Sequence, residues 1–198
     1  MKTRRCEHCR GDMPLTARAH ARFCSGRCRT AACRRRARAV DPVPVAMTRR
    51  RQWVRYTARK VPLTAAGKVA SSTDPATWST YGNARRSTAG AGCGFVLTSG
   101  DNLVCLDLDH ALDEQGRPLP WARELLGQLP DTYVEISPGG RGLHVWGRGT
   151  VGRGRRIRRG EEAVEVYDRG RFMTITRRPY EGASSALADL SEAIASLT

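Results

Sequence analysis

The chain is 198 residues long, and hydrophobic residues make up 40% of it. This length and composition are enough for one core of ordinary size with a small appendage, and they exclude two full-sized cores. No apolar run approaches the ~20 residues that span a bilayer, and the charged residues 1–5 lead into Cys and His instead of an apolar signal sequence. We therefore expect a soluble, cytoplasmic protein without a membrane partner.

The positive charge of the chain is concentrated near its N-terminus. The whole sequence carries 34 Lys and Arg against 19 Asp and Glu, a net charge of +15. Residues 1–60 hold 18 basic and 3 acidic residues, whereas residues 61–198 hold 16 of each, so the first segment carries the entire excess. Such a basic arm favours a polyanion, because neutralising each phosphate releases condensed counterions. Nucleic acid is the leading partner; an anionic membrane surface and a merely solubilising tail are the alternatives.

Five of the seven cysteines lie within the first 33 residues. One pair has two intervening residues, as on a tight knuckle, and a second pair at positions i and i+4 shares one face of a helix. Four sulfurs spaced in this way can meet tetrahedrally around Zn²⁺, which would supply the folding energy of a segment with few large apolar residues. We expect one structural Zn²⁺ with these four ligands: Cys6, Cys9, Cys24 and Cys28.

The cysteine segment also resembles the short FCS-type zinc modules, in which Phe-Cys-Ser-x-x-Cys-Arg opens a helix. The matching residues are 23–29 of this chain. The resemblance implies contact with nucleic acid or protein and does not decide between them. His8 or Cys33 is an alternative fourth ligand, and a disulfide or free thiols are the alternatives to a metal.

A basic helix is expected over residues 29–38, and Asp41-Pro-Val-Pro44 ends it, because proline lacks an N–H donor and restrains its predecessor. Three arginines of this helix are predicted to contact phosphates, with a solvated helix face as the alternative; they are Arg34, Arg35 and Arg36. These features divide the chain into a basic zinc-binding module at 1–39, a linker at 40–50 and a larger domain at 51–198.

Beyond the linker, apolar alternation between turn residues predicts strands. The predicted strands are residues 53–57, 94–98, 103–109, 132–137, 143–147, 164–168 and 172–176. Helices are predicted from Asp74 with Pro75 at the first helical position, over residues 120–126, and over residues 184–196 at the end of the chain. Strands and helices interleave without a glycine-rich nucleotide loop, so we expect an α+β domain with a mostly antiparallel sheet.

Two carboxylates alternate with apolar residues in the predicted strand 103–109. Alternation directs Leu106 and Leu108 into the core and places Asp107 and Asp109 on the opposite face, ~7 Å apart along the strand. Two acids so placed can share divalent metal ions. Ordinary solvent-facing polar residues are the alternative, and the depletion of Asp in strands argues against it.

Two further segments carry candidate site residues. In the glycine-rich turn 137–143, backbone N–H groups can approach an anion, and Arg141 and His144 add donors suited to a triphosphate; a structural histidine beside a hairpin is the alternative. In the strand, turn and strand of residues 163–176, Glu165 faces away from the core and is preferred over the turn residue Asp168 as a third acid. A surface Glu–Arg pair is the alternative there.

Taken in order, Asp-x-Asp, Ser-x-Gly-x-x-Gly-Leu-His and Glu-Val-Tyr-Asp-x-Gly-Arg-Phe resemble the three motifs of the archaeo-eukaryotic primase superfamily, closest to phage and plasmid primase-polymerase domains. The resemblance runs over residues 55–182. It implies an α+β palm like an RNA-recognition fold, with Asp107, Asp109 and Glu165 as catalytic ligands of two Mg²⁺ or Mn²⁺ ions. It also implies that His144 contacts the phosphates of the incoming nucleotide and that Ser137 and Arg141 lie in the nucleotide pocket.

The implied function is primer synthesis and extension in phage or plasmid DNA replication in a bacterial cell, with a single-stranded DNA template and nucleoside triphosphates. We expect a monomer that works with a separate replicative helicase. The basic run at 153–159 fits phosphate contact through Arg155 and Arg156, with a flexible solvated loop as the alternative. Two other functions stay open: a non-catalytic DNA-binding replication-accessory protein, and a metal-dependent nuclease that uses the same carboxylates.

Overall fold

The computed structural model describes residues 4–14, 16–18, 20–38, 41–151, 155–159 and 162–197. For residues 33–38, 155–159 and 162 it describes the backbone alone. The chain divides into two compact units, Met1–Asp41 and Pro42–Thr198. Within the described residues, no helix is both long enough and apolar enough to cross a bilayer.

The N-terminal unit consists of two short loops and one helix. The loops are joined by a hydrogen bond from the N–H of Glu7 to the carbonyl of Arg22 at 3.0 Å, and by side-chain bonds of 2.7 Å between the same two residues. Helix α1 spans Gly26–Arg38. The Ser25 hydroxyl accepts a hydrogen bond from the N–H of Cys28 at 3.1 Å and so satisfies one free donor at the start of the helix. The predicted basic helix is confirmed and begins at Gly26.

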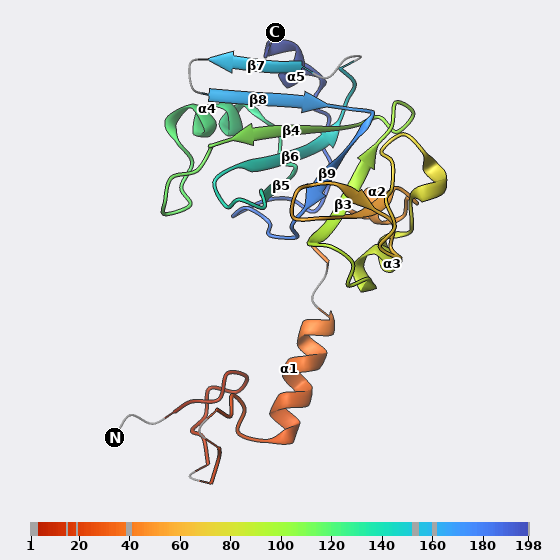
Figure 1. The fold of residues 1–198 in the computed structure, drawn as a ribbon. Helices are drawn as coiled ribbons and strands as arrows, with labels where there is room; N and C mark the ends of the chain where they lie inside the picture. The colour runs from red at the N-terminus through yellow and green to blue at the C-terminus, as the bar shows by residue number, and fades with distance from the viewer. Residues whose placement is uncertain are drawn as a thin grey trace. The chain divides into compact units, whose positions relative to one another are not determined.

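In the part of the chain that the structure describes, the larger unit is an α+β fold of nine strands and five short helical elements, most of which are labelled in Figure 1. Its helical elements are α2 (Val45–Thr48), the 3₁₀ helix η1 (Pro75–Thr77), α3 (Tyr81–Arg86), α4 (Pro120–Gln128) and α5 (Ser191–Ser196). Its strands are β1 (Trp53–Tyr56), β2 (Pro62–Leu63), β3 (Gly92–Leu97), β4 (Leu103–Asp109), β5 (Tyr133–Ile136), β6 (Leu143–Arg148), β7 (Arg155–Arg159), β8 (Glu162–Tyr167) and β9 (Arg171–Ile175).

The strands form two antiparallel sheets. One sheet has the order β2-β1-β3-β9, and the other has the order β5-β6-β4-β8-β7. Every strand pair in both sheets is antiparallel, so the predicted α+β class with an antiparallel arrangement is confirmed. The division into two sheets adds an architectural feature that apolar alternation does not specify, because alternation reports which face a residue takes and not which strand lies beside it.

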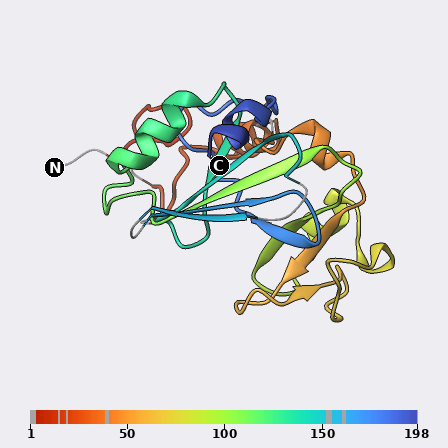
Figure 2. The same cartoon turned by 90° about the horizontal axis from the view of Figure 1, so that it is seen from above.

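Two cores cover opposite faces of the five-stranded sheet. One face packs against α4 and α5, and both helices lie on that side in Figure 2. Its core joins Leu106 of β4 to Leu125 of α4 and Ile194 of α5. The other face packs against the four-stranded sheet through large buried side chains such as Trp146 of β6 and Phe95 of β3. Strand β4 is therefore covered on both faces over its first half.

Part of the expected linker at 40–50 belongs to the larger unit. The boundary between the units falls between Asp41 and Pro42, and residues 45–48 form helix α2. Val43 and Met47 are buried in the core between the sheets, and the carbonyl of Met47 accepts a hydrogen bond from the indole of Trp53 at 3.2 Å. The apolar side chains of Val43 and Met47 explain this, because a linker exposed to solvent gains no stability from them.

The predicted closing helix at 184–196 is shorter in the structure, where α5 spans only Ser191–Ser196. The preceding segment is extended and pairs with the end of β6. The N–H of Arg148 donates to the carbonyl of Ala188 at 2.7 Å, and the N–H of Leu190 donates to the carbonyl of Arg148 at 2.8 Å. Leu190 is fully buried against Gly147, where a Cβ atom would lie 2.4 Å from the leucine Cγ. Tertiary packing thus overrides helical spacing at this position.

Candidate active site

Four polar side chains form one row across the five-stranded sheet. The register places Asp107 of β4 directly opposite His144 of β6 on one side and Glu165 of β8 on the other. On the far side of β6, His144 lies opposite Glu135 of β5. Directly opposed residues point to the same face of a sheet, so these three carboxylates and one imidazole share one face.

The alternation of β4 explains which face this is. Leu106 and Leu108 are fully buried in the core beneath α4 and α5, so Asp107 and Asp109 point to the opposite side, as predicted. Cys105 points to that same side and is fully buried between the two sheets. Asp107 lies where this second core ends, and 18% of its side chain is exposed. Strand β4 thus places the Asp107 carboxylate at the border between the core and the solvent.

The site concentrates negative charge at a partly desolvated position. Burial raises the pKa of Asp107 above the ordinary aspartate value, and the charges of Asp109 and Glu165 raise it further. The nearby cationic groups, His144 and Lys60, act in the opposite direction on that pKa. A divalent cation bound at these oxygens would relieve this repulsion, because it becomes the largest local charge.

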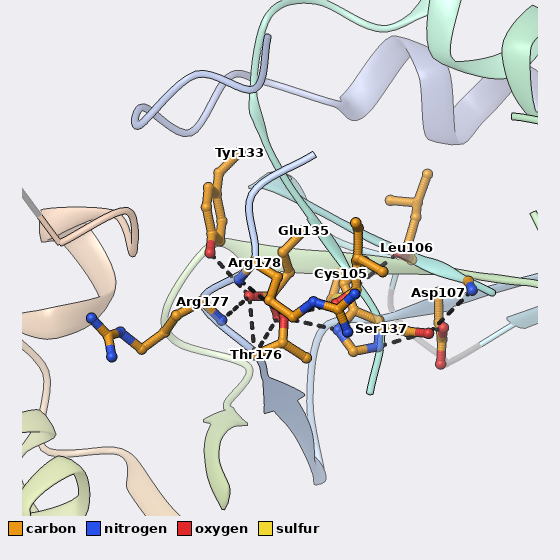
Figure 3. A network of polar contacts seen from close by, with 12 residues as sticks. Cys105, Leu106, Asp107, Tyr133, Glu135, Ser137, Thr176, Arg177 and Arg178 are labelled. Carbon is orange, nitrogen blue, oxygen red and sulfur yellow. Dashed lines mark hydrogen bonds and ion pairs between the residues drawn. The ribbon is translucent and has the colours of Figure 1, made fainter. Parts of the chain in front are cut away.

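His144 is held between two carboxylates. Its Nδ1 lies 3.3 Å from Glu135 Oε1, and its Nε2 lies 3.7 Å from Asp107 Oδ1. Glu135 is completely buried, and Figure 3 shows Tyr133, Thr176 and Arg177 gathered around it. Sequence analysis assigned no role to Glu135. The available signal was a carboxylate inside the apolar strand 132–137, but a Glu in a short alternating strand is also typical of a solvent-facing position.

Glu165 is engaged by a neighbouring aromatic residue. The Tyr167 hydroxyl donates a hydrogen bond to Glu165 Oε2 at 2.5 Å. Burial and this hydrogen bond raise the pKa of Tyr167. The Arg171 guanidinium lies 3.8 Å from the centre of the Tyr167 ring, within the range of a cation–π contact. Arg171 thereby reaches the row of acidic residues from the first position of β9.

A cleft of about 160 Å³ opens beside Asp107 and His144. Its walls come from both sheets: Lys60 lies in the loop between β1 and β2, and β9 supplies residues 171–174. The cleft therefore combines one carboxylate, one imidazole and the cationic side chains of Lys60 and Arg171. Sequence analysis assigned no role to these two cations, because only the pairing of the strands brings them beside the acids.

The structure places the other predicted nucleotide contacts at the turn between β5 and β6. The Ser137 hydroxyl accepts a hydrogen bond from the N–H of Gly142 at 3.2 Å, which closes the turn. Gly142 is tightly enclosed, since a Cβ atom there would lie 2.8 Å from the carbonyl oxygen of Leu108. Arg141 is exposed at the turn.

Asp168, the alternative third acid, is buried below the turn between β8 and β9. It accepts a hydrogen bond from the N–H of Val151 at 2.8 Å and bonds the Arg169 guanidinium at 2.9 and 3.0 Å. Only 2% of its surface is exposed. Its carboxylate therefore joins two segments of the chain, whereas Glu165 lies in the row that contains Asp107.

The two predicted phosphate-binding clusters are described only by their backbones. Arg34, Arg35 and Arg36 lie in helix α1, and their side chains are outside the described part of the structure. The same holds for Arg155 and Arg156, which lie in the edge strand β7. The register of β7 places residue 156 opposite Glu165, so the basic strand runs beside the row of acids.

The four predicted zinc ligands converge within the N-terminal unit. The sulfurs of Cys6, Cys9, Cys24 and Cys28 all lie within 4.8 Å of one another. Cys24 Sγ is 3.7 Å from Cys9 Sγ and 3.5 Å from Cys28 Sγ, close to the ~3.8 Å that tetrahedral Zn–S bonds of ~2.3 Å require.

The environments of these sulfurs fit a metal centre. None of these four cysteines forms a disulfide in the structure, which argues against the disulfide alternative. Hydrogen bonds from the backbone at Cys9 and Cys24 lower the pKa of Cys6 to about 6, and the neighbouring sulfurs raise the pKa of Cys24 to about 12. Among the residues that the structure describes, no other group of His, Cys, Asp or Glu brings three ligand atoms this close together. The carboxylates of the row across the five-stranded sheet are likewise not this close to one another. The side chain of Cys33 is not among those described.

Comparisons with known proteins show what this chain is similar to. Residues 31–192 match the family described as Prim-Pol: bifunctional DNA primase/polymerase, N-terminal. The chain is also 42% identical over 153 residues to the DNA primase-polymerase of Nitratiruptor phage NrS-1, in an alignment that covers 71% of this chain and 21% of that protein. The chain thus spans about a fifth of the length of this curated relative.

Proposed function

Because the chain belongs to the bifunctional DNA primase/polymerase family, we propose that its larger unit transfers nucleotides to a 3′-hydroxyl in primer synthesis and extension. The observation that supports this proposal most directly is the row of Asp107, His144 and Glu165 beside a cleft with two cationic side chains. Single-stranded DNA as template and nucleoside triphosphates as substrates are the partners that follow from it.

The acidic residues suit hard divalent cations. Carboxylate oxygens are the ligands that Mg²⁺ and Mn²⁺ prefer, so Asp107, Asp109 and Glu165 are the groups that would hold them. When bound, such ions activate an attacking hydroxyl and neutralise charge on a departing pyrophosphate. The raised pKa of Asp107 supports the proposal, since a bound cation would offset both causes of it, the burial of the carboxylate and the repulsion by Asp109 and Glu165.

The opposite wall of the cleft suits the triphosphate. His144 can donate a hydrogen bond from Nε2 to a phosphate oxygen, and Lys60 and Arg171 add positive charge at the same cleft. We keep Ser137 and Arg141 as proposed contacts of the nucleotide, because the turn that carries them lies at the start of the strand that carries His144. The arginines of α1 and β7 are proposed contacts of template phosphates.

The function is tested by nucleotide incorporation on a primed single-stranded DNA template with Mn²⁺. The comparator is the Asp107→Ala/Asp109→Ala double variant, with template binding measured in parallel. Incorporation by the wild type that the double variant lacks is the expected result. Equal incorporation by both proteins, or none by either with template binding intact, would contradict an enzymatic role. Template cleavage without incorporation would favour the nuclease.

We also propose that the four-cysteine cluster holds one Zn²⁺ that folds the N-terminal unit. Soft thiolate ligands suit zinc, whereas the oxygen ligands of the larger unit suit Mg²⁺ or Mn²⁺. The unit has few buried apolar side chains, and the buried hydrophobic residues of the described structure lie almost entirely beyond residue 42. Metal binding is then the main source of its folding free energy.

Chelation is therefore expected to unfold residues 4–38 and to leave the larger unit folded. The checks are zinc content, with one ion per chain expected, and the dispersion of amide signals in a ¹H–¹⁵N spectrum before and after chelation. The Cys24→Ser/Cys28→Ser double variant should contain no zinc and should give the same spectrum as the chelated protein. Cys93→Ser, a buried cysteine of β3, is the matched control and should keep its zinc. Retained zinc in the double variant would rule out this site.

A further inference from the structure

Glu135 is the most deeply buried charged side chain of the site, with no exposed surface. It accepts hydrogen bonds from three segments of the chain. The Tyr133 hydroxyl donates at 3.0 Å from the same strand, and the backbone N–H groups of Thr176 and Arg177 donate at 3.0 to 3.2 Å from the turn after β9. His144 Nδ1 on the neighbouring strand lies 3.3 Å away.

Hydrophobic packing alone does not account for an acid at this position. A buried carboxylate costs several kcal/mol unless it is fully hydrogen-bonded, and an apolar side chain of similar volume avoids that cost. Tyr133 and Trp146, which lie one step further along the same face, are large buried aromatic neighbours. The chain keeps a carboxyl group at the buried position that contacts Nδ1 of the site histidine.

The hydrogen bonds of Glu135 determine which nitrogen of His144 carries a proton. An ionised carboxylate only accepts hydrogen bonds, so the Nδ1 that contacts it must be the donor. The proton on Nδ1 leaves Nε2 directed at Asp107, at 3.7 Å, and at the cleft. This is the way in which a hydrogen bond to one ring nitrogen fixes the ring orientation of a functional histidine.

The same carboxylate ties His144 to the opposite sheet. Thr176 and Arg177 follow β9, which forms one wall of the cleft, and Arg177 has a φ of +58°, a left-handed conformation that non-glycine residues rarely adopt. The N–H of Arg177 donates to Glu135 from this conformation. Glu135 therefore contacts both His144 and the turn after β9. Figure 3 shows its contacts with Thr176 and Arg177.

We propose that Glu135 is a positioning residue: it accepts a hydrogen bond from Nδ1–H of His144 and so fixes the orientation of the ring, with Nε2 facing the cleft, where its N–H can donate to a phosphate. The catalytic consequence rests on the proposed nucleotidyl transfer, whereas the protonation of His144 does not. The informative change is Glu135→Gln, which keeps the shape and can still accept from Thr176 and Arg177. Its amide NH₂ then meets His144, whose Nδ1 has to accept a hydrogen bond and therefore carries no proton.

The primary experiment is a long-range ¹H–¹⁵N spectrum of the histidine rings, with His144 assigned by its absence from a His144→Gln sample. In the wild type we expect Nδ1 to carry a proton, and in Glu135→Gln we expect Nδ1 to lose it. Tyr133→Phe is the matched control, because it removes one hydrogen bond from Glu135 and keeps the carboxylate. This control should retain the proton on Nδ1.

Kinetics and melting separate positioning from a purely structural role. Loss of a group that orients a functional side chain typically costs about 10- to 100-fold in activity. We expect this loss in kcat for Glu135→Gln with template affinity unchanged, and a change of less than about threefold for Tyr133→Phe. An unprotonated Nδ1 in the wild type, or a proton retained on Nδ1 in Glu135→Gln, would overturn the proposal. If the wild-type protein incorporated no nucleotide, the proposed function would be contradicted. The ¹H–¹⁵N spectra would still decide whether Glu135 positions His144.

Discussion

Replacing Asp107 by Asn is expected to reduce nucleotide incorporation by at least about a thousandfold, because each 1.4 kcal/mol lost in the transition state costs tenfold and a bound metal supplies several kcal/mol. The same substitution is expected to raise the melting temperature of the metal-free protein at neutral pH. Activity and stability thus change in opposite directions. The measurements are steady-state incorporation with Mn²⁺ and thermal unfolding in a chelating buffer.

The stability gain follows from the direction of the Asp107 pKa. Burial, with the charges of Asp109 and Glu165, raises this pKa in the folded protein above its unfolded value. The contribution of Asp107 to stability is therefore fully present at low pH, where the carboxyl is protonated, and is lost as the pH rises through the raised pKa. At neutral pH the ionised carboxylate opposes folding, and the neutral amide of Asn removes that cost. The difference between the two proteins should vanish below the pH range in which carboxyl groups ordinarily titrate.

Divalent metal and a matched variant complete this test. Mn²⁺ should raise the melting temperature of the wild type, because a ligand that binds only the folded state stabilises it, and should raise that of Asp107→Asn much less. Asp131→Asn makes the same chemical change in an exposed loop ahead of β5 and should alter neither activity nor the response to Mn²⁺. A metal-free Asp107→Asn protein that melts below the wild type at neutral pH would show that Asp107 has a structural role instead.

The position of a strand, and the face that each of its residues takes, were predictable where apolar and polar residues alternate. In β4, the pattern of Leu106, Asp107 and Leu108 places the acids on one face whichever strands lie beside them. The neighbours of Asp107 could not be deduced in this way, because Glu165 is far along the chain and its register with β4 depends on the whole β8–β9 segment. The sequence therefore identified three residues of the row, Asp107, His144 and Glu165, and neither Glu135 nor their order across the sheet.

Features that depend on tertiary contact were missed or misjudged. Strand β7 contains Ile157 among arginines, which gives a weak strand signal, and it is extended because it pairs along β8. Residues 184–190 have helical spacing but pair with the end of β6, where Leu190 fills the space that Gly147 leaves. Glu135 was missed for a related reason: in a short strand, a carboxylate buried among donors from other segments has the same sequence pattern as one that faces solvent.

The two candidates for the third acid are expected to respond in opposite ways to neutralisation. Glu165→Gln should lower incorporation by about a thousandfold, as for Asp107, since both would hold the same ions. It should leave the melting temperature unchanged or slightly higher, because it removes a charge that raises the pKa of Asp107. The Tyr167 hydroxyl can still donate to the amide oxygen of Gln at this position.

Asp168→Asn is expected to reduce stability and leave most of the activity. The carboxylate is buried, accepts from the N–H of Val151 and pairs with Arg169, and weakening buried hydrogen bonds of this kind costs about 1 to 3 kcal/mol. Incorporation at a temperature well below the melting point should fall by less than about tenfold, because Asp168 bonds Val151 and Arg169, which lie outside the row of acids. The two variants should be compared by kcat/KM and thermal unfolding in the same buffer. A large loss of kcat/KM in a stable Asp168→Asn protein, with Glu165→Gln active, would exchange the roles of the two acids and move the metal site from the sheet face to the turn.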